Sequence, residues 1–285
     1  MSTEWEKNQQ QWWEGHYGGQ AAGHNYLGSP NRPQGIRHYY AEKLFRHVRS
    51  GITGKLWIDV GAGTSLVIGD LIHPLTYDYR HVAIDLSKTA LQHGQRRIQQ
   101  TPIVGSASHL PLTQSQADVV SVLGVLQYLP DWEHTFRTLI DLLKPGGYMM
   151  LTSAIRKPRI LGRWRKESYT ARFASQECYI KAEELKTIIA EKCEILLCEY
   201  SASPFRFALF WFGRLDRVTL RSHRVTKIIV ALDRLWLCTL GKLVRSLGPG
   251  EITLVARKRS RSSAATTPQP AKHQGKRDNC TGMIR

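Results

Sequence analysis

The sequence predicts an α/β domain in which a mostly parallel sheet is covered by helices on both faces, in a doubly wound, Rossmann-like arrangement. Short apolar runs alternate with helical segments over residues 55–155, which is the order of parallel βαβ units. The apolar runs are continuous rather than alternating with polar residues, as expected for strands that are buried on both faces. A glycine-rich turn follows the first run, at the place where such sheets bind ligands.

Seven segments are predicted to be strands because they are short and apolar. They are KLWIDV (55–60), HVAIDLS (81–87), PIVG (102–105), QADVVSVLG (116–124), YMMLTSA (148–154), CEILLCEYS (193–201) and EITLVARK (251–258).

Helices are predicted before and between these strands from apolar spacing and from end signals. They cover residues 37–48, 66–72, 87–100, 131–143 and 181–192. Ser87 and Asp131 are the expected N-caps of the third and fourth of these helices. The sequence KPGG at 144–147 is predicted to end the fourth.

The chain of 285 residues divides into three parts by composition. Residues 1–50 are rich in aromatic residues and form an N-terminal lid or helical segment. Residues 51–258 form the main domain, with a basic and apolar helical insert at 204–247. Residues 259–285 have almost no apolar content and are predicted to be a disordered basic tail.

Lysine and arginine number 40 against 23 acidic residues, which gives a formal charge of +17. Such a charge attracts anions, whether nucleic acid, acidic lipid head groups or phosphorylated substrates. The five cysteines form no CxxC pair, so no metal site is predicted. The polar N-terminus lacks the pattern of a signal peptide, which predicts a cytoplasmic protein, with contact to the inner membrane face left open.

The most informative string is W-I-D-V-G-A-G-T-S, Trp57 to Ser65. Glycines at the end of a strand allow a sharp turn and let a ligand approach the backbone. The string is not the dinucleotide fingerprint G-x-G-x-x-G, because Leu66 stands at the third glycine. About twenty residues on, the second strand ends in Asp85, where a carboxylate can accept both ribose hydroxyls. Taken alone, either of the acids at 59 and 85 could instead be a helix-capping residue.

Five motifs in order resemble those of class I S-adenosylmethionine-dependent methyltransferases, in the group that includes the ubiquinone and menaquinone C-methyltransferases (methyltransferase type 11). They are D-V-G-A-G-T-S from residue 59, V-A-I-D-L-S from 82, GSASHLPL from 105, ADVVSVLGVLQYLPD from 117 and LLKPGGYMMLT from 142. The resemblance implies a seven-stranded sheet of order 3-2-1-4-5-7-6 with an antiparallel last strand. It also implies S-adenosylmethionine as the cofactor.

The resemblance also implies which residues bind that cofactor. Asp59 would orient the methionyl ammonium, Asp85 would hold the ribose, and the segment at 105–112 would lie beside the adenine. The full predicted set is Asp59, Gly61, Ala62, Gly63, Asp85, Leu86, Ser106, Ala107 and Leu123. Two residues depart from the family pattern: Ser65 replaces its third glycine, and Ser106 replaces its usual aspartate, which weakens the expected contact to the adenine amino group.

Methyl transfer from a sulfonium needs a general base only when the acceptor carries a proton of unsuitable pKa. The candidates are His16, Tyr17, His24, Tyr26, His109 and Tyr128, and the sequence does not choose among them. The cluster WWEGHYGGQAAGHNYLG (12–28) is either a lid, which this family often has, or an aromatic patch packed on the helix at 37–48. We favour the patch from the sequence alone.

The acceptor is predicted to be a small molecule with an apolar or lipid-like character, because the insert at 204–247 combines large apolar residues with arginines. We read this insert as a substrate-covering cap in preference to a membrane contact. An RNA methyltransferase is an alternative that only the charge favours, since G-V-L-Q-Y-L (124–129) lacks the [DN]-P-P-[YF] motif of base-methylating enzymes. A non-catalytic binding protein with this fold is a third possibility, suggested by Ser65 and Ser106.

Overall fold

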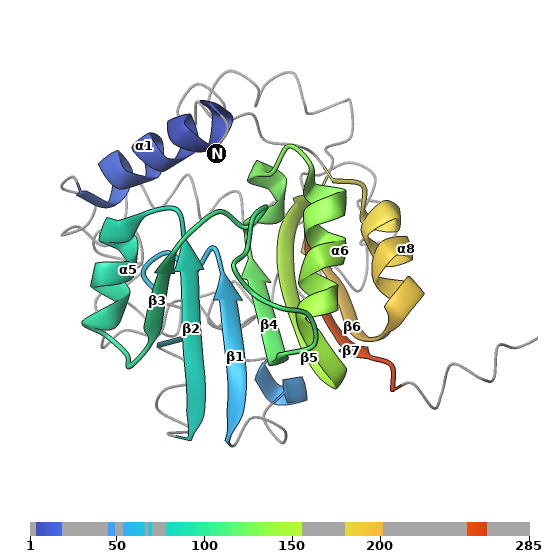
Figure 1. Cartoon of the computed structure of the whole chain (residues 1–285). Coiled ribbons are helices and arrows are strands. Elements are labelled where there is room, and N and C mark those ends of the chain that lie inside the picture. Colours follow the sequence, from blue (N-terminus) through green and yellow to red (C-terminus); the bar gives the residue numbers. More distant parts are fainter. Residues whose placement is uncertain are drawn as a thin grey trace, which may run out of the picture.

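A computed structural model describes residues 4–18, 45–48, 54–65, 68–69, 78–155, 180–201 and 250–260. Seven strands form one sheet in the order β3-β2-β1-β4-β5-β7-β6 (Figure 1). They are β1 (Lys55–Val60), β2 (Tyr79–Asp85), β3 (Thr101–Val104), β4 (Ala117–Leu123), β5 (Leu143–Ile155), β6 (Cys193–Ser201) and β7 (Gly250–Lys258). Only β7 is antiparallel to its neighbours, β5 and β6. The predicted strand order is therefore confirmed.

Helices flank this sheet on the described part of the chain. They are α1 (Glu4–Gly18), α5 (Lys88–Gln95), the short 3₁₀ helix η2 (Leu126–Tyr128), α6 (Trp132–Leu142) and α8 (Ala182–Lys192). Ser87 is the N-cap of α5, as predicted, because its hydroxyl accepts a hydrogen bond from the amide of Ala90 at 3.0 Å. None of these helices is long and apolar enough to cross a membrane.

Helix α6 begins and ends where the sequence predicted, but two details beside it differ from the prediction. Asp131 stands at the N-cap of α6, but its side chain makes no capping hydrogen bond. Strand β5 begins at Leu143, directly after α6, so the KPGG sequence lies within the strand and does not precede it. The strand accommodates KPGG through a register shift in its pairing with β4, where Leu143 pairs with Ala117 and Tyr148 with Val119.

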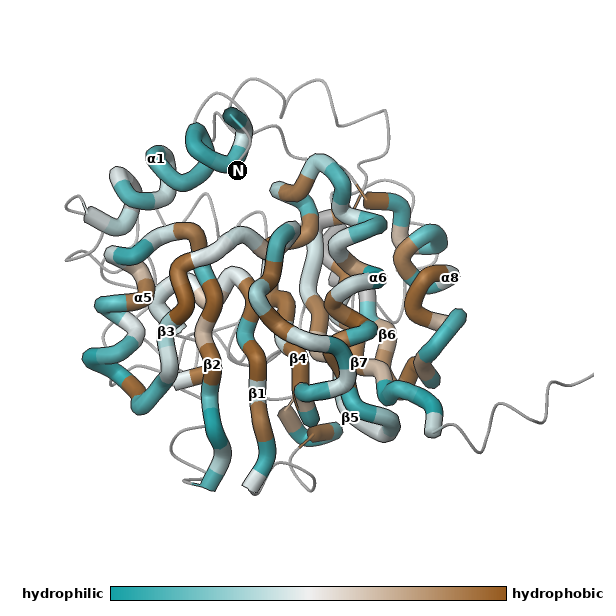
Figure 2. Tube along the Cα trace, in the orientation of Figure 1, coloured by the Kyte–Doolittle hydropathy of each residue, from teal (hydrophilic) through white to brown (hydrophobic). Residues whose placement is uncertain are grey.

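The central strands, such as β1 and β4, are buried on both faces, as their continuous apolar runs predict, whereas the edge strand β3 is largely exposed (Figure 2). One face packs against α6 and α8, with Phe136, Leu139 and Ile189 fully buried against strand residues such as Ile58. The other face buries Trp57 together with residues that include Phe45, Val48, Ile68 and Val119. This burial fixes the directions in which the strand ends project.

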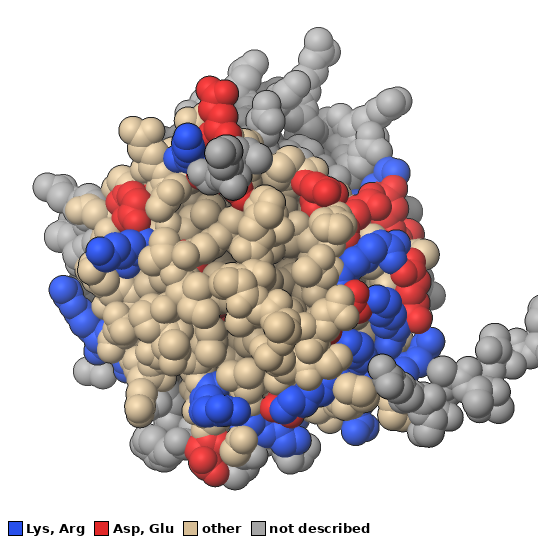
Figure 3. Space-filling view, in the orientation of Figure 1, with Lys and Arg blue, Asp and Glu red and all other residues tan. Residues whose placement is uncertain are grey.

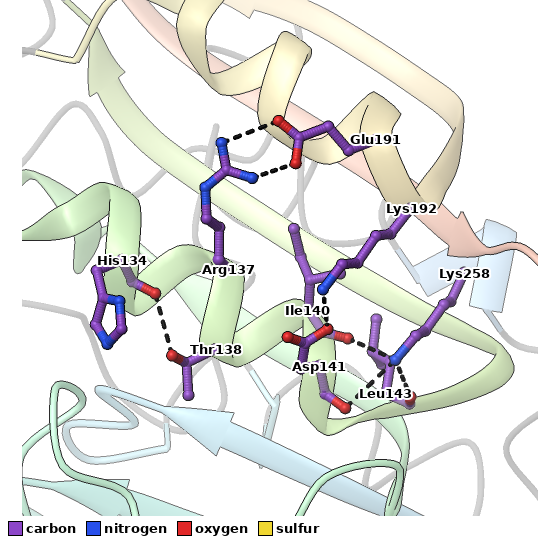
Figure 4. A network of polar contacts seen from close by, with 9 residues as sticks. All are labelled: His134, Arg137, Thr138, Ile140, Asp141, Leu143, Glu191, Lys192 and Lys258. Atoms are coloured by element: carbon purple, nitrogen blue, oxygen red, sulfur yellow. Dashed lines mark hydrogen bonds and ion pairs between the residues drawn. The ribbon is translucent and has the colours of Figure 1, made fainter.

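Polar contacts hold the helices at the amino end of the sheet (Figure 4). The ammonium of Lys258, at the end of β7, donates to the carbonyl oxygens of Ile140 and Leu143 at 3.1 and 2.6 Å, and to that of Asp141 at 3.3 Å. These carbonyls lie at the end of α6 and the start of β5, where the negative end of the helix dipole favours a cation. Arg137 of α6 pairs through both its terminal nitrogens with Glu191 of α8.

The opposite, carboxyl end of the sheet lies under α1, which crosses above the ends of the first strands in Figure 1. Strands β1, β2 and β4 are parallel and end at this edge. The predicted helix at 37–48 is described only at residues 45–48, and that at 66–72 only at 68–69, both helical. The insert at 204–247 and the tail beyond residue 260 lie outside the described residues.

Candidate functional site

The turn after β1 requires glycine for a packing reason as well as a conformational one. Gly61 has φ +68°, and the amides of Gly61 and Ala62 both donate to the carbonyl of Ile84 at 2.8 and 3.0 Å. A Cβ placed on Gly61 would lie 2.1 Å from Cγ2 of Val125, in the turn after β4. The turns that follow β1 and β4 therefore touch each other across the end of the sheet.

The acid at the end of β2 is bonded directly to the turn after β1. The Asp85 carboxylate accepts a hydrogen bond from the amide of Gly63 at 2.8 Å and another from the amide of Ser87 at 2.8 Å. Burial raises the pKa of Asp85, and these two amides act in the opposite direction. Each carboxylate oxygen has a second lone pair that remains able to accept from a ligand hydroxyl.

Asp59 is more deeply buried, with 4% of its surface exposed. Its Oδ1 accepts a hydrogen bond of 2.5 Å from the hydroxyl of Ser121 on β4. That hydroxyl accepts in turn from the indole Nε1 of Trp57 at 2.8 Å. Burial raises the pKa of Asp59 to about 7, the Ser121 bond opposes the rise, and the nearby charge of Asp85 adds to it.

Ser65, which replaces the family's third glycine, has the left-handed backbone that a glycine would have, with φ +49°. Its buried hydroxyl donates to Oε1 of Gln100 at 2.6 Å. It also lies 3.0 Å from the position that a Cβ on Gly94 of α5 would occupy. The serine thus ties the turn to α5 and β3, and its departure from the pattern has a structural explanation.

Helix α1 contacts the same turn and the start of α5. The carboxylate of Glu14 accepts from the amides of Lys88 and Thr89 at 2.6 and 3.3 Å, in the first turn of α5. An acid is stabilised there because the first helical amides lack partners. The hydroxyl of Tyr17 lies 2.8 Å from the position that a Cβ on Gly63 would occupy.

Aromatic rings continue this contact toward the turn after β4. The ring of Trp13 stacks on Tyr17 with centroids 5.8 Å apart, and meets Tyr128 of η2 edge-on at 5.7 Å. Helix α1 therefore lies against both turns, after β1 and after β4, which meet at the carboxyl end of the sheet. Residues 19–28 of the aromatic cluster and 37–44 of the predicted helix lie outside the described residues, so the choice between lid and patch stays a prediction.

The remaining predicted residues lie around the same edge. Ser106 accepts the amide of Ser108 at 3.2 Å and so forms part of a turn, Ala107 is buried, and Leu86 and Leu123 are half-buried. His109 is exposed, and its Nδ1 lies 3.1 Å from Oε1 of the buried Glu6 on α1. The side chain of His16, and the whole of His24 and Tyr26, lie outside the described residues.

Sequence reasoning singled out the cluster at 12–28 but gave no role to its residues Trp13 and Glu14, and it missed Glu6 on the same helix. The signal for Glu14 was weak but present. Ser87 caps one amide of the helix that follows it, which leaves the amides at 88 and 89 in need of an acceptor. An acidic residue within the aromatic cluster supplies it across 74 residues of sequence.

The residues at this edge fit S-adenosylmethionine by the chemistry of their donors and acceptors. The carboxyl of Asp59 is buried and that of Asp85 is half-buried, and no Lys or Arg of the described chain pairs with either of them. A ligand with an ammonium group and a ribose diol would supply a cation to one carboxylate and hydroxyl donors to the other. The glycines between them keep the backbone amides close to that ligand.

Comparison with known proteins agrees with this geometry. Residues 58–151 match the family model of the methyltransferase domain. A 116-residue stretch is 27% identical to the ubiquinone biosynthesis O-methyltransferase of Marinobacter nauticus, covering 39% of this chain and 49% of that protein. The matched stretch thus spans about half the length of that curated relative.

Solved structures share the fold. A geranyl diphosphate C-methyltransferase from Streptomyces coelicolor A3(2), crystallised with S-adenosyl-L-homocysteine, has a TM-score of 0.61 at 15% identity, covering 90% of this chain and 99% of that chain. The [4+2]-cyclase SpnF has a TM-score of 0.56 at 18% identity, covering 91% and 98%. At these identities the likeness shows the fold alone, which hosts more than one kind of chemistry.

Proposed function

We propose that this chain transfers a methyl group from S-adenosylmethionine to a small-molecule acceptor with a large apolar part, because residues 58–151 match the methyltransferase-domain model and the seven described strands have the class I order. The observation that carries the proposal is the 2.8 Å hydrogen bond from the amide of Gly63 to the carboxylate of Asp85. It joins the turn from Gly61 to Gly63, here called the glycine turn, to the acid at the end of β2, so that the two form one site. In the family that this chain resembles, these two features hold the adenosyl group.

Each predicted residue then has a role in binding and orientation. Asp85 accepts the ribose hydroxyls, Asp59 faces the methionyl ammonium, and the backbone from Gly61 to Gly63 approaches the cofactor closely. Leu86, Ser106 and Ala107 line the adenine side, and Leu123 the methionine side. The cofactor supplies an electrophilic methyl group, so the protein's task is to align the acceptor and exclude water.

Helix α1 is the lid in this proposal. Glu14 anchors it to the start of α5, and Tyr17 and Trp13 lie over the two turns. The hydroxyl of Tyr17 is the base candidate that the structure supports best, because it lies beside Gly63 in the glycine turn. His109 is exposed and engaged by Glu6, which makes it a weaker candidate.

The division of charge along the chain favours an acceptor that is anionic as well as apolar. The described residues contain 15 of the 40 basic and 16 of the 23 acidic residues, which leaves 25 basic and 7 acidic residues for the rest. On the face shown in Figure 3, the described Lys and Arg side chains gather along the margins and leave the middle mostly uncharged. The excess positive charge is thus carried elsewhere in the chain.

Two segments carry most of that excess. Residues 156–179 contain seven basic and two acidic residues, and residues 202–249 contain nine basic and two acidic residues. Strand ends that border them meet at the carboxyl end of the sheet, where Ile155 pairs with Gly250 and bridges Ile180. Both segments therefore leave from and return to the edge that holds the glycine turn. We propose a phosphate- or carboxylate-bearing amphiphile as the acceptor class, with peripheral contact to an acidic membrane as its extension.

An RNA acceptor is the second candidate, and the positive charge is the observation that favours it. It predicts RNA affinity that falls steeply with salt. The non-catalytic alternative rested on Ser65 and Ser106. The hydrogen bond from Ser65 to Gln100 gives Ser65 a structural role, so only Ser106 still supports a non-catalytic binding protein.

The test is methyl transfer itself. The full chain is incubated with methyl-labelled S-adenosylmethionine and a cell extract fractionated into lipids, small polar molecules and RNA. We expect label in the lipid or small-molecule fraction, and none with the Asp85→Asn variant. Label confined to RNA would support the second candidate, and unlabelled fractions despite cofactor binding would support a binding protein. Flotation with acidic and neutral liposomes tests the membrane contact and the cytoplasmic, peripheral location.

A further inference from the structure

A buried histidine lies beside Asp59 and has no role in the function proposed so far. His81 projects from β2 with 3% of its surface exposed, and its strand position is paired with Trp57 of β1. Its Nε2 lies 4.0 Å from Oδ2 of Asp59. Neither ring nitrogen has a hydrogen-bond partner among the described residues. Buried polar atoms without partners are rare in folded proteins, so each calls for an explanation.

The surroundings of Asp59 show which of its oxygen atoms His81 could support. The Ser121 hydroxyl occupies Oδ1, whereas Oδ2 accepts no hydrogen bond within the described part of the chain and faces His81. The other titratable groups nearby are Asp85 and Tyr79, both on β2, and neither brings a positive charge. An ionised Asp59 would therefore be buried without a cation, which is the costly state.

Burial disfavours the charged form of both Asp59 and His81. It raises the pKa of Asp59 to about 7 and lowers the pKa of His81 to about 4. It also raises the pKa of Tyr79 to about 12, so this phenol stays protonated. Near neutral pH, then, Asp59 is divided between its two forms while His81 carries a single proton and no charge.

We propose that binding of the cofactor's ammonium releases a proton from Asp59, and that His81 is the positioning residue that supports the carboxylate so formed. This inference rests on the proposed function, because the ammonium belongs to that cofactor. The O–H bond of Asp59 breaks, its proton passes to the solvent, and the carboxylate pairs with the ammonium. His81 keeps its own proton and donates its Nε2–H to Oδ2, which requires the two atoms to approach by about 1 Å.

Two consequences follow from linkage. Ligand affinity rises with pH, close to tenfold per unit while Asp59 is mostly protonated, and levels off above about pH 7. Removal of the histidine donor leaves the carboxylate less well supported. The pH at which proton release is half complete then moves upward, and affinity at neutral pH falls.

The experiment is calorimetric titration of S-adenosyl-L-homocysteine, which has the ammonium but no methyl group to transfer, in buffers of different ionisation enthalpy. We expect release of close to one proton at pH 6 and much less at pH 8. Asp59→Asn should release none at either pH. His81→Phe keeps the ring volume without a donor and should bind roughly tenfold more weakly at pH 7. His81→Gln, which places an amide donor near the same point, should restore much of the loss.

The control is His134→Gln on α6, because this histidine is exposed and is not among the groups that affect the pKa of Asp59. Near-ultraviolet circular dichroism confirms that each variant has folded. Wild-type binding without proton release at pH 6 would overturn the coupling. A His81→Phe variant with wild-type affinity and release would overturn the role of His81. Absence of binding at every pH would instead overturn the proposed function on which this inference rests.

Discussion

The two ends of the sheet differ in whether their carboxyl groups have basic partners. At the amino end each carboxylate that Figure 4 shows has a basic partner, Arg137 with Glu191 and Lys192 with Asp141, while Lys258 is surrounded by carbonyl oxygens. At the carboxyl end Asp59 and Asp85 accept only from backbone amides and one hydroxyl, and no described Lys or Arg approaches them.

This difference separates stability from function. The charged groups at the amino end, on α6, α8 and β7, already have partners within the chain and need none from a ligand. At the carboxyl end, Asp59 and Asp85 have no cationic partner among the described residues, so a ligand can supply the cation and the hydroxyl donors. Raised pKa values at a sheet edge next to a glycine turn are typical of a binding site. Variants at the two ends should therefore fail in different ways.

The largest expected effect comes from a methyl group added in the glycine turn. Gly61→Ala should destabilise the fold by about 2–5 kcal/mol, from the clash with Val125 and from the left-handed backbone. Gly54→Ala at the amino end is the matched control, because Gly54 has φ +69° but no atom within 4 Å of the added Cβ. It should cost only about 1–2 kcal/mol.

Urea unfolding measures both of these variants. The double variant Gly61→Ala with Val125→Ala should recover part of the loss, because the second change removes the atom that clashes. If Gly61→Ala and Gly54→Ala lowered the free energy of unfolding equally, the contact between the two turns would not contribute to stability.

The second effect is a pair of opposite pH trends in stability. The pKa of Asp59 in the folded chain, about 7, lies above the ordinary value, so its contribution to stability is complete below about pH 4 and is lost as pH rises through 7. Asp59→Asn should therefore gain on the wild type as pH rises, by about 2–4 kcal/mol in total.

His81 has the opposite sign, because its pKa in the folded chain, about 4, lies below the ordinary value of 6.5. Its contribution to stability is complete above about pH 6.5 and is lost as pH falls through 4. His81→Phe should therefore gain on the wild type as pH falls. Denaturant unfolding from pH 4 to 8 measures both differences, and parallel trends in the two variants would refute the assignment.

A smaller effect is expected at the anchor of α1. Glu14→Gln removes a negative charge from the N-terminal amides of α5 and should cost about 0.3–1 kcal/mol of stability. Because α1 lies over the glycine turn, affinity for S-adenosyl-L-homocysteine should fall several-fold as well. Fluorescence of Trp12 and Trp13 can follow the loosening of α1, and an unchanged affinity would argue against the lid.

The smallest effect is expected at the amino end. Arg137→Ala removes an exposed ion pair with Glu191, and such pairs add little to stability because water screens them. Stability should change barely, and cofactor affinity not at all. A loss of affinity here would contradict the separation of the two ends.

The sequence predicted the central strands β1 and β4 well, because each is a mostly apolar run of the kind that is buried on both faces of a sheet. It misplaced the start of β5, since KPGG reads as a stop although Leu143 already pairs with Ala117. It also assigned Asp131 a capping bond that the side chain does not make. Such local signals are overridden by tertiary pairing.

The glycine turn and Asp85 were found from sequence because their spacing and residue types reflect the chemistry directly. The contacts of Glu14 and His81 were not found, for two physical reasons. Glu14 meets its partners across 74 residues, which no local pattern records. His81 lies on β2, where polar and apolar residues do not alternate. The sequence therefore does not show that its side chain lies on the same face of the sheet as Asp59.

The most direct test of the account is titration of S-adenosyl-L-homocysteine into the wild type, Asp85→Asn and Asp85→Ala at pH 8, with Asp131→Ala as control. We predict that wild type and Asp131→Ala bind equally, and that Asp85→Ala loses roughly 1–3 kcal/mol of binding free energy. Equal affinity of the wild type and both Asp85 variants would contradict the claim that this acid and the glycine turn together hold the cofactor.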